Sequence, residues 1–303
     1  MAGVFYIDGI SSETFGVFVR DGGYSGLVSY PTMKAPDQNT WAEYDGVEVD
    51  LSEPKFDKRE YKLSLVARQS GDIGAFIALL SDGVYHEFDF SDIMLTRCYR
   101  MVNVDGYTGN LNSIRTFDLV LSEDDPLVGY ETRPNPAFSV EQNDYSIDDV
   151  LFSDYGVYIL EGSDAEILKQ PAVSQNLTVS TKNTNGVIYD GNSVKFQPKD
   201  VQLKCAIVAD NISDFWSNYR SLFFDLSQPN ERVFRFISEE YNCYLKGSEC
   251  TKFSFVGGKI WCEFTLTICM TSFRNYDETK VLFTFLGKLI KTFSAKSIKL
   301  LKK

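Results

Sequence analysis

The sequence predicts a mainly β protein of the α+β class, built from two tandem modules. Aromatic residues make up 14% of the 303 residues, and their side chains pack well on pleated sheets. Several stretches alternate polar and apolar residues with the period of two that indicates half-buried strands. An opening motif also occurs twice, and two modules of ordinary size agree with the length of the chain.

The repeat is clearest near the N-terminus. Residues 7–17 contain Ile-Asp-Gly followed by Phe-Gly-Val, and residues 147–157 contain Ile-Asp-Asp followed by Tyr-Gly-Val. Pro31 and Pro171 keep the same offset of 140 residues. In each copy we expect a short strand, a turn set by the aspartate, and a second short strand.

Long loops follow. Residues 33–46 are rich in Pro, Asp, Gln and Asn and are expected to form an exposed loop that contains Trp41. Residues 174–191 contain an Asn-Gly pair and are expected to form a hairpin. Tyr44-Asp-Gly46 and Tyr189-Asp-Gly191 align at an offset of 145, which predicts about five extra residues in this loop of the second copy.

Each copy continues with a long strand and one helix. The strands are expected at residues 60–68 and 201–209, and the helices at residues 72–80 and 213–224, the latter with Ser213 as N-cap. Apolar residues at helical spacing indicate core contacts rather than a ligand site. Further strands are expected at residues 85–90, 97–104, 113–121, 232–236, 241–246 and 260–268. Each module is therefore an α+β unit, or a β-sandwich or barrel with one flanking helix.

These elements suggest four parts. We place the first module at residues 1–125, a short linker stiffened by prolines at 126–144, the second module at 145–275, and a basic extension at 276–303.

The extension is predicted to be an amphipathic helix. Its apolar residues recur at steps of three and four, and lysines lie elsewhere on the helical wheel. Such a helix could pack on its own acidic body, dock on a neighbouring subunit, or bind a membrane surface. The candidate docking residues are Leu282, Phe285, Leu286, Lys288, Leu289, Ile290, Lys291 and Phe293.

The charge is unevenly distributed. The net charge is −12, but residues 280–303 contain seven lysines and no acid, so residues 1–279 carry 23 basic and 42 acidic side chains, a net of −19. An acidic body argues against wrapping nucleic acid, because Lys and Arg make the contacts to phosphate. The acidity could also serve only solubility. No stretch approaches the ~20 apolar residues of a membrane span, and the absence of a secretory signal at the N-terminus predicts folding in a cytoplasm.

Signatures of enzymes and metal sites are missing. The six cysteines form no close pair, as a zinc site would need, and are expected to be buried. His86 is the single histidine, and its polar neighbours in a strand suggest a surface residue rather than a general base. No nucleophile elbow or phosphate-binding loop occurs. No catalytic residue, cofactor or metal is therefore assigned, although a glycosidase pair among the carboxylates stays open.

The repeated order of Ile-Asp-Gly, Phe/Tyr-Gly-Val, an isolated proline, Tyr-Asp-Gly and a long alternating strand resembles the N-terminal domain of phage distal tail proteins. That family is related to tail-tube and tail-hub proteins. The resemblance covers both modules but not residues 279–303, and it implies two tail-tube-like modules. Distal tail proteins usually carry one such domain and a different C-terminal domain, so the second copy is a departure.

The resemblance implies a structural protein of the virion that is assembled in the host cytoplasm. Modules of this family form rings around the DNA channel by joining sheets, so partners would be further copies of the chain, the tail tube, the tail tip or hub, and the tape measure protein. Two modules per chain allow a trimer with six modules or a six-fold ring with an extra layer. An acidic channel would let DNA pass without specific binding. The alternatives are a virion carbohydrate- or receptor-binding module and, less favoured, a tail-associated hydrolase.

Overall fold

The computed structural model describes residues 3–41, 44–109, 113–174, 178–189, 195–272, 280–281 and 299–300. Within these residues the fold is mostly β, with 43% strand and 17% helix, and the sheets are antiparallel. This confirms the predicted fold class. In the described part of the chain, no helix is long and apolar enough to cross a membrane.

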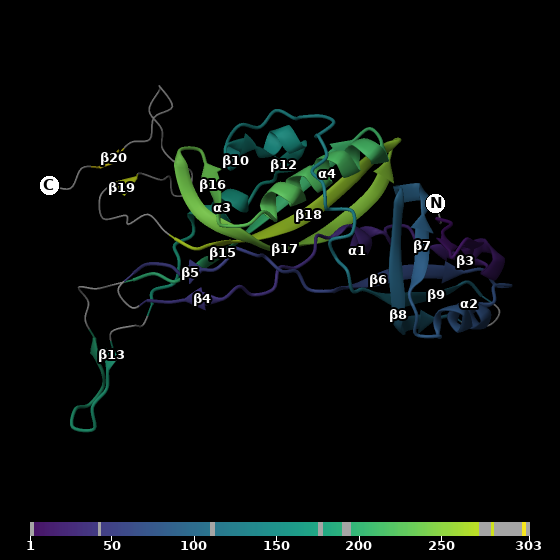
Figure 1. The fold of residues 1–303 in the computed structure, drawn as a ribbon, viewed down its shortest axis with the longest axis horizontal. Coiled ribbons are helices and arrows are strands. Elements are labelled where there is room, and N and C mark those ends of the chain that lie inside the picture. Colours follow the sequence, from purple (N-terminus) through teal and green to yellow (C-terminus); the bar gives the residue numbers. More distant parts are fainter. Residues whose placement is uncertain are drawn as a thin grey trace.

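The first unit is a seven-stranded antiparallel sheet in the order β2-β1-β7-β8-β9-β6-β3 (Figure 1). Its strands are β1 (Tyr6–Ile7), β2 (Ile10–Ser11), β3 (Val17–Val19), β6 (Arg59–Ala67), β7 (His86–Phe90), β8 (Leu95–Thr108) and β9 (Arg115–Glu123).

The second unit has a sheet of the same order, β11-β10-β16-β17-β18-β15-β12. Its strands are β10 (Tyr145–Ile147), β11 (Val150–Leu151), β12 (Val157–Ile159), β15 (Lys199–Ala209), β16 (Arg232–Phe236), β17 (Glu239–Val256) and β18 (Lys259–Met270). As the alternation of β18 predicts, Ile260, Cys262, Phe264, Leu266, Ile268 and Met270 are buried.

Each unit has more helix than the sequence predicts. The α-helices are α1 (Ser25–Val28), α2 (Ile73–Leu80), α3 (Ser163–Leu168) and α4 (Ile212–Leu226), and the 3-10 helices are η1 (Ser12–Phe15), η2 (Ser91–Ile93) and η3 (Phe152–Tyr155). The expectation of one helix per module missed α1 and α3, because four to six residues give too little periodicity to detect. Ser213 is not the N-cap of α4. Asn211 is, because its Oδ1 accepts from Asp214 N over 2.9 Å.

The repeated aspartate sets a turn, as predicted. Asp8 and Asp148 have positive φ angles of 49° and 47° in the hairpins β1–β2 and β10–β11. Their carboxylates accept from backbone N–H groups of the adjacent strand, from Glu87 over 2.9 Å and from Val233 over 2.8 Å. The motif thus fixes the opening hairpin to the rest of its sheet.

In each unit, the residues that precede the first strand are hydrogen-bonded to the edge strand at the other end of the sheet. The groups that make these bonds differ between the two units. In the first unit Gly3 and Val19 exchange two backbone hydrogen bonds of 3.0 and 2.8 Å. In the second unit the side-chain amide of Gln142 makes the same pair with the backbone of Ile159, donating over 3.0 Å and accepting over 2.7 Å. A side chain therefore replaces a stretch of backbone.

Each unit also extends an arm between its short helix and its long strand. We name residues 29–58 the first arm and residues 169–198 the second arm. At the base of the first, Lys34 N donates to Lys55 O over 2.8 Å, and at the base of the second, Ser174 N donates to Lys195 O over 2.7 Å. Both bonds correspond at an offset of 140.

The arms carry matching hairpins. Their strands are β4 (Gln38–Asn39), β5 (Glu48–Val49), β13 (Thr178–Val179) and β14 (Ile188–Tyr189). Gln38 pairs with Val49, and Thr178 pairs with Tyr189, again at an offset of 140. The predicted insertion of five residues in the second copy is therefore wrong, because Tyr189 corresponds to Val49 and not to Tyr44.

The C-terminal extension contributes one further pair of strands. β19 (Lys280–Val281) and β20 (Lys299–Leu300) are antiparallel, so the extension is not helical at these four residues. The predicted docking residues, between 282 and 293, lie outside the described residues. Helical structure there stays a prediction.

Candidate assembly surface

The first arm joins the two units by docking on the open edge of β17. Strand β16 pairs with β17 only over residues 239–243, so the following residues of β17 lack a strand neighbour on that side. The first arm occupies this edge: Met33 N donates to Lys246 O over 2.8 Å, and Cys250 N donates to Ser29 Oγ over 2.9 Å. In Figure 1 the arm runs from the first unit beneath the second sheet to β4 and β5.

Tyr30 anchors this joint. Its side chain is 2% exposed, and its ring stacks on Tyr219 of α4 with centroids 4.1 Å apart. Phe223 lies 4.9 Å from the same ring, and the Tyr30 hydroxyl donates to Tyr219 O over 2.7 Å. Burial raises the pKa of Tyr30 well above its usual value, so the hydroxyl remains a donor.

The tip of the first arm reaches the base of the second arm. Gly46 N donates to Phe196 O over 2.8 Å, and Phe196 N donates to Asp45 Oδ1 over 2.9 Å. Val47 N donates to Thr271 O at the end of β18 over 2.9 Å. Gly46 has a φ of +78°, and a Cβ there would lie 1.8 Å from Thr271 O. Only glycine fits this position.

A buried ionic cluster holds the base of the first arm. Arg59 and Glu123 are 8% and 2% exposed and form an ion pair, and Tyr61 donates to the same carboxylate over 2.5 Å. Arg59 also donates to Ser29 O, the first residue of the arm, over 2.6 Å. Arg97 approaches Glu123 to 3.4 Å. The Glu123 carboxylate therefore forms ion pairs with both Arg59 and Arg97.

The base of the second arm is built with different chemistry. Lys199 takes the place of Arg59, and its Nζ donates to Ile167 O over 2.7 Å and to Lys169 O, which corresponds to Ser29 O. Met270 stands opposite Lys199 where Glu123 stands opposite Arg59. Because the amine is buried without a paired carboxylate, its pKa falls to about 8.

The second arm leaves the body of the molecule. Figure 1 shows its hairpin, labelled β13, extending away from both sheets. Within the described residues, the hydrogen bonds of residues 178–189 stay inside the hairpin. Its apolar side chains are exposed, with Val179 at 56%, Val187 at 57% and Ile188 at 59%. Among the described residues, the second arm thus has the form of the first but binds no open strand edge.

His86 is buried, and the expectation of a surface residue was wrong. Its Nδ1 lies 2.6 Å from Asp8 Oδ2 and its Nε2 lies 3.1 Å from Asp82 Oδ1. Burial lowers the pKa of His86, but the hydrogen bonds and charges of the two carboxylates outweigh it and the pKa lies above its usual value. The histidine is a clamp between β7 and the β1–β2 hairpin, and sequence could not show that the repeated aspartate would face it.

A histidine pKa that is raised on folding predicts a specific pH dependence. The stabilisation should be fully present below the unfolded pKa of about 6.5 and should be lost as pH rises through the folded pKa. The single histidine resonance in NMR spectra would give the folded pKa directly. Urea titrations of the wild type and of His86→Asn should converge at high pH, whereas a folded pKa below the unfolded value would contradict this assignment.

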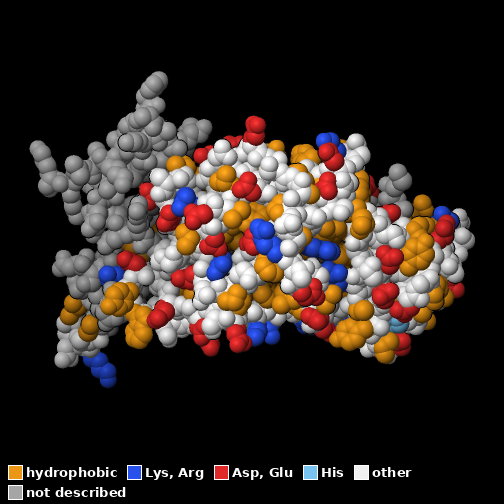
Figure 2. All heavy atoms as spheres, turned by 45° about the horizontal axis from the view of Figure 1, so that its top comes forward, with side chains coloured by type: hydrophobic (Ala, Val, Ile, Leu, Met, Phe, Trp, Pro, Cys, Tyr) orange, Lys and Arg blue, Asp and Glu red, His pale blue; other side chains and the backbone are white. Residues whose placement is uncertain are grey.

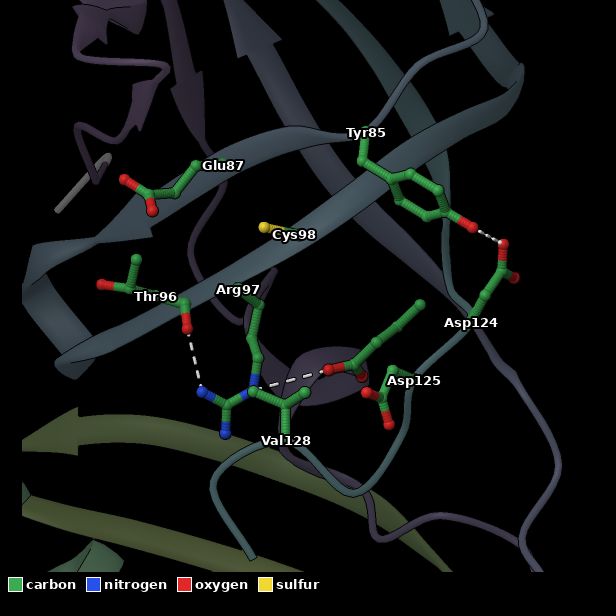
Figure 3. A pocket seen from close by; sticks show the side chains of 9 residues that line it. Tyr85, Glu87, Thr96, Arg97, Cys98, Asp124, Asp125 and Val128 are labelled. Atoms are coloured by element: carbon green, nitrogen blue, oxygen red, sulfur yellow. Dashed lines mark hydrogen bonds and ion pairs between the residues drawn. The ribbon is translucent and has the colours of Figure 1, made fainter.

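A pocket of about 580 Å³ lies between β8 and the segment that follows β9 (Figure 3). Arg97 donates to Thr96 O over 2.8 Å and pairs with Glu123, and Asp124 accepts from Arg100 over 2.7 Å. Hydrogen bonds from Arg100, Ser122 and Tyr85 hold the pKa of Asp124 far below its usual value. An acid that stays ionised is a poor proton acceptor near neutral pH, so Asp124 acts here as the charged partner of Arg100.

The residues that build the joint were missed at the sequence level. Only Pro31 and Pro171, at their shared offset, marked where the arms begin. Tyr30, Arg59 and Glu123 carry no motif, because their roles depend on contacts between distant segments. Among the described residues, no group of His, Cys, Asp and Glu side chains is arranged to hold a metal ion.

Comparison with known proteins shows no matching family and a weak similarity to a solved structure. No family model and no curated protein matches the chain. Among solved structures, the chain is similar to the crystal structure of the Dit protein of phage SPP1, described as a paradigm of the hub adsorption apparatus in phages that infect Gram-positive bacteria. The TM-score is 0.32 at 10% identity, over 89% of this chain and 99% of that one. The similarity is weak in both sequence and structure.

Proposed function

We propose that the chain is a structural protein of a phage tail, a ring-forming distal tail or tail-hub component with a duplicated module. In this proposal residues 1–125 and 145–275 are the two modules, 126–144 link them, and 276–303 dock on a neighbour. The ring surrounds the DNA channel and joins the tail tube to the baseplate or the tail tip, and its acidity lets DNA slide through. The tape measure protein is a further partner, and the protein is assembled in the host cytoplasm.

The observation that carries the proposal is the contact between the units. It is heterologous, since the arm of one unit binds the open edge of β17 in the other. Head-to-tail contacts between like units propagate, and they form a closed ring when the rotation between units closes. The sequence resemblance to distal tail proteins supplies the biological setting.

Mass in solution tests this proposal. Size-exclusion chromatography with light scattering should give a closed oligomer whose mass is a fixed multiple of 34.3 kDa, three or six copies being expected. A monomer at every concentration and salt condition would refute ring formation by the chain alone.

A second function, binding of a carbohydrate or receptor, is favoured by the exposed aromatics of the first arm. Trp41 is 52% and Tyr44 70% exposed, and both line a shallow pocket with Asn39 and Glu48. Exposed aromatic side chains with neighbouring polar groups suit stacking on sugar rings. Glycan binding by the monomer that is lost in Trp41→Ala would support this role.

A further inference from the structure

The first unit carries an open edge that corresponds to the docking site of the first arm. Strands β8 and β17 both have a bulge against their neighbour, between Met101 and Asn103 in β8 and between Leu245 and Gly247 in β17. The equivalent bulge residues are therefore Val102 and Lys246. Lys246 O accepts the hydrogen bond from the first arm.

This edge is uncovered in the first unit. Strand β7 pairs with β8 only over residues 95–99, and in the described part of the chain no loop backbone donates to Val102 O, as Met33 N donates to Lys246 O. Val102 is 44% exposed, and Asn103 is exposed, whereas its counterpart Gly247 is buried under the first arm. Figure 2 shows hydrophobic side chains gathered at the right-hand end of the molecule, where the first unit lies. Open edges of this kind favour pairing with another strand.

We propose that the second arm of one copy docks on the β8 edge of the first unit in the next copy. The proposal rests on the proposed function, because it names the contact that closes the ring. By equivalence with the joint inside the chain, Val173 N bonds Val102 O and Gly186 N bonds Phe56 O of the next copy. Asn185 Oδ1 accepts from Phe56 N, as Asp45 accepts from Phe196 N.

The residues at these positions keep the required chemistry. Asn185 supplies a side-chain oxygen where Asp45 does. Gly186 has a φ of +84°, close to the +78° of Gly46, but its Cβ position is empty in the single chain. Phe56 corresponds to Phe196, and in the described part of the chain neither its N–H nor its carbonyl has a hydrogen bond. Among the described residues, Val173 N, Gly186 N and the Phe56 carbonyl thus have no hydrogen-bond partner.

Charge favours this partner. Residues 169–198 contain three basic and one acidic side chain, a net of +2, whereas residues 29–58 contain three basic and seven acidic, a net of −4. Residues 1–125, which would receive the second arm, contain 10 basic and 21 acidic side chains, a net of −11. Opposite charges steer association and raise its rate.

One part of the joint is not reproduced. The second arm has Gln170 where the first has Tyr30, so the docking between copies lacks the aromatic anchor. The contact between copies should accordingly be weaker than the one inside the chain. Assembly is then reversible and depends on concentration and salt.

Cross-linking tests the pairing directly. In a Cys98→Ser background, which removes the exposed thiol, Val102→Cys and Val173→Cys are combined and the protein is oxidised. Val102 lies in β8 and Val173 follows α3, and Figure 1 shows these two elements well apart, so a disulfide between the two sites must join two copies. We expect a ladder of covalent multiples of 34.3 kDa. The control pairs Val173→Cys with Ile10→Cys, a similarly exposed site in β2, which β1 and β7 separate from β8, and should give no ladder.

Gly186→Asn provides a second test. Asparagine tolerates positive φ, and a Cβ at this position has no atom within 4 Å in the single chain, so the fold should be retained. In the docked arm its Cβ would meet the next copy, as a Cβ at Gly46 would meet Thr271 O. We expect the concentration needed for assembly to rise about tenfold or more. Gly257→Asn, also at positive φ in open space, should leave assembly unchanged.

The outcomes separate this inference from the proposed function. A ring that forms normally with Gly186→Asn and gives no cross-linked ladder overturns the docking of the second arm, while the ring-forming function stands. A wild-type protein that stays monomeric overturns both. A ladder together with the Gly186→Asn defect supports both.

Discussion

Replacing Tyr30 with alanine should lower the free energy of unfolding by about 3–5 kcal/mol, the range for removing a large buried aromatic side chain. The cavity would lie between the two units, because Tyr30 belongs to the first arm and packs on Tyr219 and Phe223 of α4. Urea denaturation would measure the loss. Hydrogen exchange should also accelerate at Cys250 N, whose bond to Ser29 depends on the seated arm.

Two controls make this result specific. Tyr30→Phe keeps the ring and loses only the hydrogen bond to Tyr219 O, so it should cost about 1 kcal/mol. Gln170→Ala changes the corresponding, exposed residue of the second arm and should leave the monomer's stability unchanged. A loss below about 1 kcal/mol for Tyr30→Ala would show that the ring is not an anchor.

Replacing Glu123 with methionine should cost about 3–5 kcal/mol, because it leaves Arg59 buried without its carboxylate. The second unit suggests the compensating change. There Met270 stands opposite Lys199, and the lysine is satisfied by two backbone carbonyls.

The double variant Arg59→Lys with Glu123→Met recreates the second unit's pair in the first unit. We expect it to recover part of the stability lost in Glu123→Met, and a double-mutant cycle in urea would measure the coupling. A double variant whose loss of unfolding free energy equals the sum of the two single losses would show that the residue pairs at the bases of the two arms are not interchangeable.

The sequence predicted the fold class because it depends on local signals. Alternation placed β6, β15 and β18, and helical spacing found α2 and α4. The Asp8 and Asp148 turns followed from turn chemistry. Matching short triplets misled the alignment of the arms, because Tyr-Asp-Gly contains too little information to fix a register.

The joint between the units could not be predicted in the same way. Tyr30 lies 189 positions from the tyrosine whose carbonyl it binds, and His86 lies 78 positions from Asp8. The importance of such residues arises from packing between distant segments, which periodicity does not encode. The equivalence of the two arms lies in their hydrogen-bond registers, which short sequence triplets do not encode.

In the proposed ring, the two arms have different uses. One heterologous contact is made inside the chain, where it is anchored by Tyr30 and needs no encounter between molecules. In the proposed ring, the other contact is made between copies during assembly. A chain that makes every second contact within itself halves the number of association steps for a ring of a given size. The effective concentration of the two linked units is also high.

Electron microscopy of the assembled protein tests the central claim most directly, that the two units alternate around one ring. Class averages viewed along the ring axis should show twice as many units as there are chains, with the chain number taken from the mass of the same sample. Rings with one unit per chain, and the second unit in a separate layer, would contradict alternation. So would particles of a single chain at every concentration.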